Sequence, residues 1–231
     1  MEKCRKGLFI LAMMNIIKQL LDWIYRRNCY FCHKPSSTGI MCQTCYEKIE
    51  LNFPEPTKVV NGVPVYSASL YIDNLKKLIR GLKYHKQKEL AKYMAGILYT
   101  YWQNTNINNE NIEIIPMPLY KKRQKQRGYN HIELVAEEFS KLTGFPVNKS
   151  LVKRIKDTKP QYRLKRVQRL ENLKDAFEID QKAYNKTKLL LLDDICTTGI
   201  TLGEMIKTLQ KNNITDLYAI VGANPVSIYE R

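Results

Sequence analysis

The segment 189–201 holds the residues of this chain whose types and spacing best suit the binding of a sugar phosphate. It reads Leu-Leu-Leu-Leu-Asp-Asp-Ile-Cys-Thr-Thr-Gly-Ile-Thr. The four leucines predict a buried strand, Asp193 and Asp194 follow at its carboxyl end, and a loop rich in threonine and glycine leads into a helix. Backbone N–H groups and hydroxyls at the start of a helix can surround a phosphate. The paired carboxylates suit the vicinal hydroxyls of a ribose or a hydrated Mg²⁺.

Four of the six cysteines form two CxxC pairs, Cys29 with Cys32 and Cys42 with Cys45, separated by nine residues. Four thiolates from two tight turns enclose one tetrahedral Zn²⁺ at about 2.3 Å per sulfur. We therefore predict a structural zinc site with no open position for water. Disulfides are the alternative, which a reducing compartment disfavours. Cys29 to His33 also matches the attachment signature of c-type haem, a hypothesis that leaves Cys42 and Cys45 unexplained.

Positive charge is concentrated in two stretches of the chain. Thirty-eight Lys and Arg against 22 Asp and Glu give a net charge of +16. Residues 121–127 hold five basic residues and no acid, and residues 153–169 hold eight basic residues and one acid. Such a focused charge indicates a polyanionic partner, with solvated loops as the plain alternative. Tyr120, Tyr129 and Tyr162 lie near these stretches and could stack on bases, or equally be buried or incidental.

The composition, 44% hydrophobic with ten glycines and nine prolines, excludes a disordered or low-complexity chain. The first 26 residues imitate a secretory signal, with basic residues before the apolar run 8–14. No small-residue cleavage site follows, and Lys18 and Asp22 interrupt the run short of the ~20 residues of a spanning helix. We predict an amphipathic helix in 1–26 and no integral membrane segment. Residues 1–12 are interpreted as an over-extended start, with Met13 or Met14 as the true one.

We expect a zinc module at 27–50, a linker rich in proline at 51–62 and one main domain at 63–231. Within the main domain the sequence predicts a strand or hairpin at 65–72 and strands at 112–115, 189–192 and 217–221. Helices are expected after the capping residue Asp73, over 88–102, after the capping box Asn130 and Glu133, and over 202–209. In the first helix we expect Leu75, Leu78, Ile79 and Leu82 to face inward and Lys76, Lys77, Arg80 and Lys83 to face solvent. Strands alternating with helices predict a mostly parallel sheet flanked by helices.

The segment 189–201 resembles the phosphoribosyl diphosphate (PRPP) motif of type I phosphoribosyltransferases. Two further stretches, Ile115-Pro-Met-Pro-Leu119 and Arg127-Gly-Tyr-Asn130, look like the pattern of the ComF family. So do Gln161, Arg169, Asn172 and Phe177 further along, and the two CxxC pairs in front of such a domain. The resemblance runs from about Ile16 to Val221.

This resemblance implies an α/β fold with a type I phosphoribosyltransferase-like sheet, preceded by a small four-cysteine zinc module. It also implies a cytoplasmic protein, with the inner face of the membrane as an open alternative, that handles incoming single-stranded DNA beside other competence proteins. Asp193 and Asp194 would bind ribose hydroxyls and be the catalytic candidates, with Mg²⁺ accompanying PRPP. The 5′-phosphate would be held by Thr197, Thr198, Gly199 and Thr201. Arg127 would lie where pyrophosphate oxygens bind, and 153–169 where related enzymes carry a mobile loop.

An active phosphoribosyltransferase, which would move ribose 5-phosphate from PRPP to an unknown nitrogen acceptor, is the alternative function. The carboxylates and the phosphate loop would suffice to begin that chemistry, because it depends largely on charge stabilisation. We find no signature for the acceptor, so the sequence leaves the enzyme question open. Cys196, within the loop, is interpreted as a packing residue rather than a nucleophile, since no His lies near it in sequence.

Overall fold

The computed structural model describes residues 27–108, 110–157 and 173–225, and it divides the chain into two units, 1–48 and 49–231. The helix predicted in 1–26 lies outside the described residues, as do Tyr162, Gln161, Arg169 and Asn172. Most of the second basic stretch, 153–169, also lies outside them. Among the described residues, no helix is long and apolar enough to cross a membrane.

The first unit is built around its cysteines. An isolated antiparallel bridge joins Asn28 to Pro35, and the short helix α2 (Gln43–Glu47) carries Cys45. Thr38 Oγ1 donates a hydrogen bond to the Met41 carbonyl at 2.9 Å. Phe31 and Met41 are buried, as are the first and last of the four paired cysteines. So few apolar side chains are a small core for an independent unit, and small units of this kind usually need a metal or disulfides.

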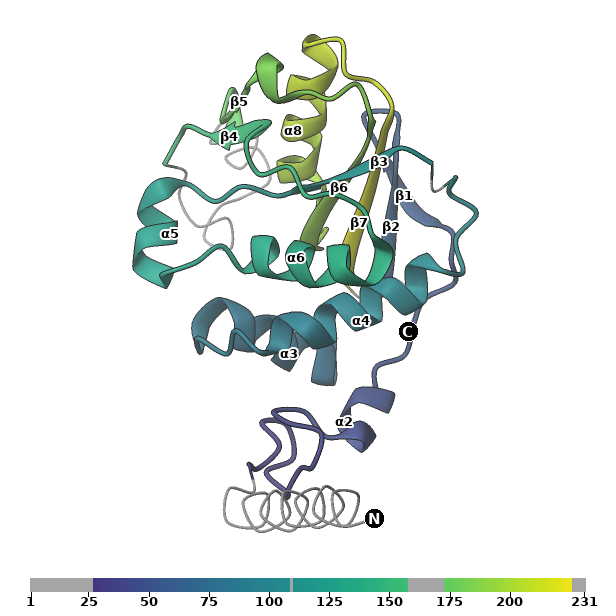
Figure 1. The fold of residues 1–231 in the computed structure, drawn as a ribbon, viewed down its shortest axis with the longest axis vertical. Coiled ribbons are helices and arrows are strands. Elements are labelled where there is room, and N and C mark those ends of the chain that lie inside the picture. The colour runs from purple at the N-terminus through teal and green to yellow at the C-terminus, as the bar shows by residue number, and fades with distance from the viewer. Residues whose placement is uncertain (1–26, 109, 158–172, 226–231) are drawn as a thin grey trace, which may run out of the picture. The chain divides into compact units, whose positions relative to one another are not determined.

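The second unit contains a five-stranded sheet in the order β1-β2-β7-β6-β3 (Figure 1). Its strands are β1 (Pro56–Val60), β2 (Val63–Leu70), β3 (Ile112–Pro116), β6 (Lys188–Ile195) and β7 (Leu217–Asn224). The last four pair in parallel, and β1 pairs antiparallel with β2. A separate two-stranded antiparallel sheet is formed by β4 (Val152–Arg154) and β5 (Phe177–Ile179), before the 3-10 turn η2 (Gln181–Ala183). The prediction of a mostly parallel sheet flanked by helices is confirmed.

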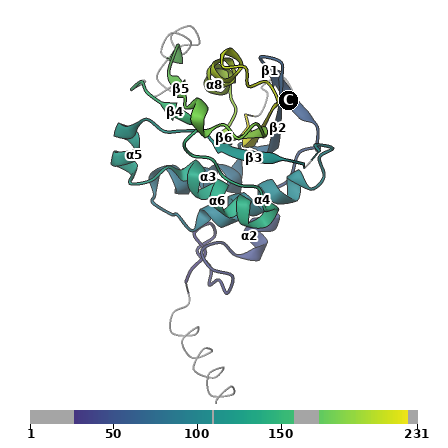
Figure 2. The ribbon, with the colours of Figure 1, turned by 45° about the horizontal axis from the view of Figure 1, so that its top comes forward.

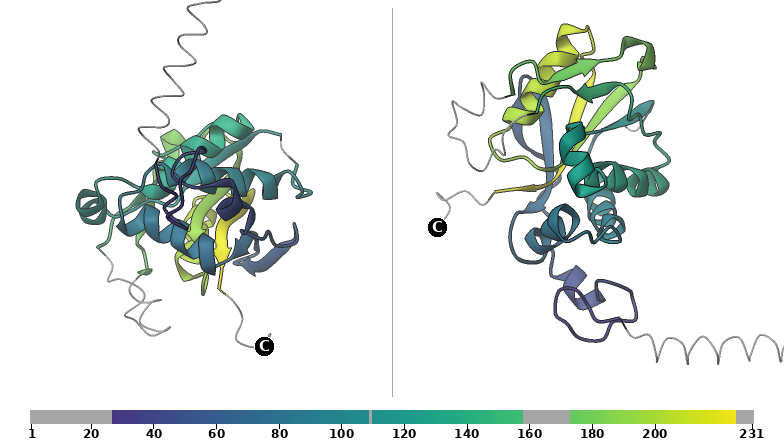
Figure 3. Two further views of the ribbon diagram at one scale, coloured as in Figure 1. Left: turned by 90° about the horizontal axis from the view of Figure 1, so that it is seen from below. Right: turned by 90° about the vertical axis from the view of Figure 1, so that its left-hand side faces the viewer.

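Helices cover both faces of this sheet, because its central strands are apolar on both sides. On one face α4 (Leu90–Trp102) packs on β2 and β7, and α6 (His131–Thr143) packs on β3 and β6. The helix α8 (Ile200–Lys211) lies on the other face (Figure 3). The layers are tight at Gly222 in β7, where an added Cβ would lie 1.7 Å from Met94 Cε of α4. Any side chain at this position would require Met94 to move.

The segment 51–62, expected to be a linker, contributes the edge strand β1. Asn61 and Gly62 both have positive φ, 48° and 80°, and they form the two-residue turn that joins β1 to β2. An Asn-Gly pair between runs of β-branched residues is a strong signal for such a hairpin, because both turn positions need left-handed backbone. The prolines of the segment favour a linker by composition, but Pro56 is tolerated at the start of an edge strand.

The helix α3 (Asp73–Tyr84) buries the expected stripe of Leu75, Leu78, Ile79 and Leu82. Two details differ from expectation. Asp73 lies inside the first turn, and the cap position is Ile72, which has no side-chain cap. Lys83 does not face solvent: its side chain is 20% exposed and forms an ion pair inside the second unit.

The predicted capping box at the start of α6 is present in modified form. Asn130 caps the helix, and its side-chain oxygen accepts the N–H of Ile132 at 3.1 Å. Glu133 accepts a hydrogen bond from the Asn130 side-chain amide at 3.0 Å, where a capping box of the usual kind would use the backbone N–H. The cap fixes the point at which the chain turns from the basic stretch into α6.

Candidate sugar-phosphate site

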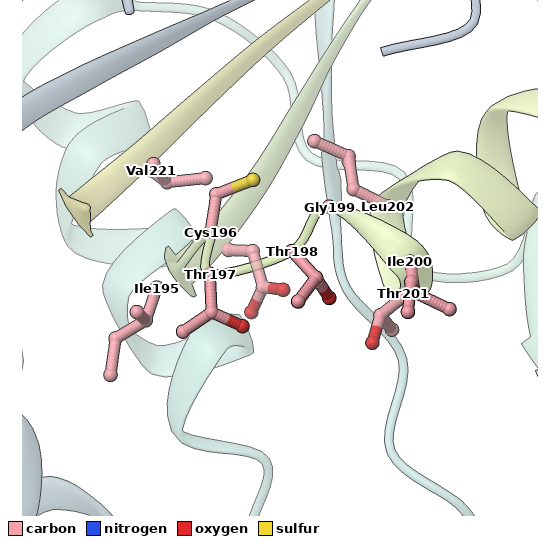
Figure 4. A pocket seen from close by; sticks show the side chains of 10 residues that line it. Ile195, Cys196, Thr197, Thr198, Gly199, Ile200, Thr201, Leu202 and Val221 are labelled. Carbon is pink, nitrogen blue, oxygen red and sulfur yellow. The ribbon is translucent and has the colours of Figure 1, made fainter. Parts of the chain in front are cut away.

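A pocket opens where β6 and β7 end and α8 begins (Figure 4). Figure 4 shows the side chains of Thr197 and Thr198, from the loop between β6 and α8, together with Thr201 from the first turn of α8. Gly199 occupies the cap position of α8 with φ 76°, a left-handed conformation that glycine adopts without strain. The lining consists of Asp193, Ile195, Cys196, Thr197, Thr198, Gly199, Ile200, Thr201, Leu202 and Val221.

Five of the predicted ligand-binding residues therefore share one pocket. They are Asp193, Thr197, Thr198, Gly199 and Thr201. The pocket is lined by hydroxyls, it lies at the start of a 12-residue helix, and a carboxylate stands at its edge. The positive end of the helix dipole and the N–H groups of the first turn favour a phosphate there. This arrangement can bind a phosphate ester that carries hydroxyls within reach of Asp193.

The second carboxylate, Asp194, is not in the lining of the pocket. Successive side chains of a strand point to opposite faces, and Asp193 and Asp194 are neighbours within β6. Asp194 consequently turns to the side of α3 and α6, where only 6% of the residue is exposed. Its Oδ2 lies 2.6 Å from Lys83 Nζ and 2.5 Å from His131 Nε2. Of the two carboxylates that the sequence proposed for a ribose, only Asp193 lines the pocket.

Arg127 reaches this cluster indirectly. Its Nη1 lies 2.7 Å from Nδ1 of His131. A guanidinium only donates hydrogen bonds, so Nδ1 must be the acceptor, and the proton of the neutral ring sits on Nε2, where it is donated to Asp194. Arg127, His131, Asp194 and Lys83 form a continuous chain of contacts that runs from the basic stretch to the strand end.

The two adjacent carboxylates have opposite pKa shifts. Burial works against ionisation of Asp194, but the charge of Lys83 and the hydrogen bonds donated by His131 and Lys83 outweigh burial and hold the pKa of Asp194 well below its usual range. Burial and the charge of Asp194 raise the pKa of Asp193 to about 7, against the opposing effect of Lys83. Burial alone would lower the pKa of Lys83, yet its pairing with Asp194 raises it. Asp194 and Lys83 are thus a fixed ion pair, and Asp193 is the carboxylate able to change its protonation near neutral pH.

The first basic stretch forms the helix α5 (Lys121–Arg127), which lies at the edge of the second unit (Figure 2). None of its residues is buried, and Lys121, Lys122 and Lys125 are exposed. Gly128 ends the helix with φ 84°. An exposed helix with five basic residues and no acid can follow a polyanionic backbone.

The tyrosines near α5 differ in what they can do. Tyr129 is buried, its hydroxyl donates to the Leu82 carbonyl at 2.6 Å, and it does not offer a face to a base. Tyr120 is partly exposed at the cap position of α5.

Cys196, in the pocket loop, is buried, and burial raises the pKa of its thiol, which agrees with a packing role.

The four paired cysteines form a cluster in the first unit that can hold a metal ion. The sulfur atoms of Cys29, Cys32, Cys42 and Cys45 all lie within 4.8 Å of one another. Four sulfurs at about 2.3 Å from one ion stand about 3.8 Å apart, and Cys32 Sγ lies 3.8 Å from Cys42 Sγ. Two backbone N–H groups, of Phe31 and Cys42, donate to Cys29 Sγ at 3.4 Å. Although burial opposes it, such N–H groups lower the pKa of Cys29 to about 6, which favours the thiolate that a metal needs.

Three residues at or beside the site were not anticipated from the sequence: Lys83, His131 and Lys58, whose Nζ donates to the carbonyl of Thr197 in the pocket loop at 2.6 Å. Lys83 was placed on the solvent side of α3 by its helical position, and Lys58 lay in the expected linker. His131 directly follows the capping residue Asn130, and polar residues are common in the first turn of a helix, so its type gave no reason to single it out. The signal that could have found it is its place one residue after a motif already singled out, in a chain with only three histidines.

Comparison with known proteins shows similarity along most of the chain. The chain is 28% identical to competence protein F of Haemophilus influenzae over 198 residues. This alignment covers 82% of the chain and 86% of that protein. The chain is 25% identical over 189 residues to the DNA utilization protein YhgH of Salmonella typhimurium, with coverage of 80% and 78%. Competence protein ComFC of Bacillus subtilis is 24% identical over 174 residues, with coverage of 75% and 68%. No family model matches the chain.

Proposed function

The chain belongs to the ComF family, as its similarity to competence and DNA utilization proteins supports, and from this premise we propose that it handles incoming single-stranded DNA during natural competence. The observation that carries the proposal is that relatives with such names match about four fifths of the chain. We place this activity in the cytoplasm, at the inner face of the membrane, where other competence proteins would deliver the strand.

The helix α5 is proposed as the part of the surface that follows the DNA backbone. The helix contains no acidic residue beside its exposed lysines, which are Lys121, Lys122 and Lys125. Lys122 Nζ pairs with the exposed Asp157 Oδ2 at 3.2 Å. Exposed ion pairs of this kind are weak, so Lys122 can exchange that partner for a phosphate. Each phosphate contact contributes to a salt-dependent affinity.

Fluorescence anisotropy with a short single-stranded oligonucleotide at several salt concentrations tests this proposal. We expect the logarithm of the binding constant to fall linearly with the logarithm of the salt concentration. Replacement of the three lysines by Gln should reduce that slope by about 2, because each neutralised phosphate contributes about 0.7. The matched control replaces three exposed lysines elsewhere, Lys182, Lys207 and Lys211, and should change the slope little. Equal effects of the two triple variants, or no binding at low salt, would contradict the proposal.

For the pocket at the end of β6 we propose a PRPP-type phosphate ester as the ligand. The loop 197–201 would hold the 5′-phosphate, and Asp193 would accept the sugar hydroxyls. Asp193 would hold the Mg²⁺ that accompanies such a ligand, and the ion would supply neutralisation of the pyrophosphate charge. Asp194 would not contact the ligand: it would hold Lys83 as its counter-ion and His131 as a hydrogen-bond acceptor. Among the described residues we find no feature that identifies a nitrogen acceptor, so binding is proposed and turnover is not.

For the four-cysteine cluster we propose zinc with a structural role. Four thiolates are a soft ligand set that favours zinc over hard cations, and a closed site leaves no position for a substrate. Because the core of the first unit is small, the free energy of metal binding would supply much of the stability of its folded state.

A further inference from the structure

The β1–β2 hairpin lies against the loop of the proposed phosphate site. Lys58 Nζ, from β1, donates a hydrogen bond to the Thr197 carbonyl at 2.6 Å. At the tip of the hairpin, the Asn61 side-chain amide donates to the Gly203 carbonyl at 2.7 Å, and the main-chain carbonyl of Asn61 accepts from Gln210 Nε2 at 3.0 Å. The hairpin therefore makes polar contacts with both the loop and α8, although at least 139 residues of sequence separate the partners.

Apolar packing reinforces these contacts at the glycine that turns the chain into α8. A Cβ built on Gly199 would lie 3.0 Å from Val60 Cγ2, and one built on Gly203 would lie 3.1 Å from Val60 Cγ1. Val60 thus rests on the loop and on the first turn of α8. The loop is supported from outside by an edge strand of the sheet, and its conformation does not depend on the loop alone.

The contact of Lys58 has a stereochemical consequence for phosphate binding. The Thr197 carbonyl and the Thr198 N–H belong to one planar trans peptide, so they point in opposite directions. A hydrogen bond that fixes the carbonyl also fixes the direction of that N–H. The left-handed Gly199 follows directly, and a residue of this conformation turns successive N–H groups toward a common point, as in anion-binding nests.

We propose that Lys58 is a positioning residue of the sugar-phosphate site, which holds the Thr197–Thr198 peptide so that the loop presents its N–H groups to a phosphate. The inference rests on the proposed function, since the phosphate ester is the ligand named there. The ammonium group also brings a positive charge to the loop, where it is felt by Cys196. This role explains why a basic side chain of an edge strand is directed at a main-chain carbonyl.

The test compares Lys58→Met, which keeps the length of the side chain and loses the ammonium, with Lys58→Arg, which can still donate to the carbonyl. Lys211→Met removes the same charge at the far end of α8 and is the matched control. In titrations with ribose 5-phosphate we expect Lys58→Met to weaken binding about tenfold, as for the loss of a hydrogen bond from a charged group. Lys58→Arg should restore most of the affinity, and Lys211→Met should resemble the wild type. Equal affinities of Lys58→Met and Lys211→Met would overturn the proposal.

A second measurement needs no ligand and separates this inference from the proposed function. Backbone ¹⁵N relaxation of the free protein reports the order parameters of the Thr198 and Gly199 amides. We expect Lys58→Met to lower them and Lys58→Arg to keep them, while the rest of α8 stays unchanged. Unchanged order parameters in Lys58→Met would overturn the positioning role even if ribose 5-phosphate does not bind the wild type. If Lys58→Met lowers the order parameters but the wild type does not bind ribose 5-phosphate, Lys58 still supports the loop. That result would contradict only the proposed phosphate-ester ligand.

Discussion

His131 and Asp194, 63 residues apart in the chain, are joined by a buried hydrogen bond of 2.5 Å between Nε2 and Oδ2. Arg127 donates to the other ring nitrogen, which fixes the tautomer that donates to Asp194. Burial lowers the pKa of His131, the charges of Lys83 and Arg127 lower it further, and together they outweigh the attraction of Asp194. A neutral imidazole therefore connects the end of the basic helix to the carboxylate at the end of β6.

His131→Ala should lower the free energy of unfolding by about 1–3 kcal/mol, because it removes a donor from a buried carboxylate. Urea unfolding monitored by circular dichroism measures the change. His131→Gln is the informative partner, since its amide can donate to Asp194 while its oxygen accepts from Arg127. We expect Gln to recover a clear part of the loss. If Ala and Gln are equally destabilising, the two hydrogen bonds of the ring are not what stabilises this site.

Lys83→Met should be more damaging, with a loss of about 3–5 kcal/mol, because it leaves Asp194 as a buried charge without its ion-pair partner. The double variant Lys83→Met/Asp194→Asn should be more stable than Lys83→Met alone, since the unpaired charge is then removed as well. Lys76→Met, on the exposed side of the same helix, is the control and should change stability by less than about 0.5 kcal/mol. Similar losses for Lys76→Met and Lys83→Met would contradict the buried ion pair.

The raised pKa of Asp193 predicts a particular pH dependence of stability. With the pKa of Asp193 raised to about 7, the folded protein binds this proton more tightly than the unfolded chain does, so the contribution of Asp193 to stability declines as pH rises from about 4 to about 7. The lowered pKa of His131 acts in the opposite direction below about pH 6.5, so the effect of Asp193 is isolated by comparing the variant with the wild type at each pH. Asp193→Asn removes the ionisation and should have a higher Tm than the wild type at about pH 8, with the difference shrinking toward about pH 4. The lowered pKa of Asp194 acts only below this window. Thermal unfolding across the range measures the effect, and the exposed Asp216→Asn is the control. A difference in Tm that does not vary with pH would contradict the assignment.

The long elements of the fold could be predicted because each depends on its own hydrophobic pattern. The apolar run Leu189–Leu192 is buried on both sides within β6, and the stripe Leu202, Met205, Ile206 and Leu209 is buried in α8. The strand β1 could not be recognised from composition, because Pro54, Pro56 and Gly62 are typical of linkers. Its pairing with β2 depends on the Asn61–Gly62 turn, a local signal that composition obscures.

The part of the candidate site that is one continuous segment was predictable from the sequence. The contacts between residues of distant elements were not. The loop 197–201 is one continuous segment, so its residues meet in one pocket as expected. The opposite directions of Asp193 and Asp194 follow from strand alternation once β6 is seen to extend through both residues. Lys58, Lys83 and His131 come from β1, α3 and α6, and their contacts depend on how those elements pack, which a single sequence does not specify.

Cys42→Ser should abolish metal binding, because a hydroxyl does not replace a thiolate at a soft-ligand site. We expect about one zinc ion per chain in the wild type and a lower Tm of the first unit when zinc is lost. Zinc content measured by mass spectrometry of the purified protein checks the first point. Cys196→Ala, which removes a buried thiol outside the cluster, is the control and should keep its zinc. A well-folded wild type without metal would contradict the proposal.

The most direct test of the central proposal is isothermal titration of PRPP with Mg²⁺ into the zinc-loaded protein, repeated with a short single-stranded oligonucleotide and then with both together. Thr198→Val, which removes one hydroxyl from the pocket, serves as the site variant. We predict that PRPP and the oligonucleotide both bind, that Thr198→Val weakens only PRPP, and that salt weakens the oligonucleotide strongly. An oligonucleotide that does not bind, or PRPP that binds the variant and the wild type equally, would contradict the proposed function of this surface and this pocket.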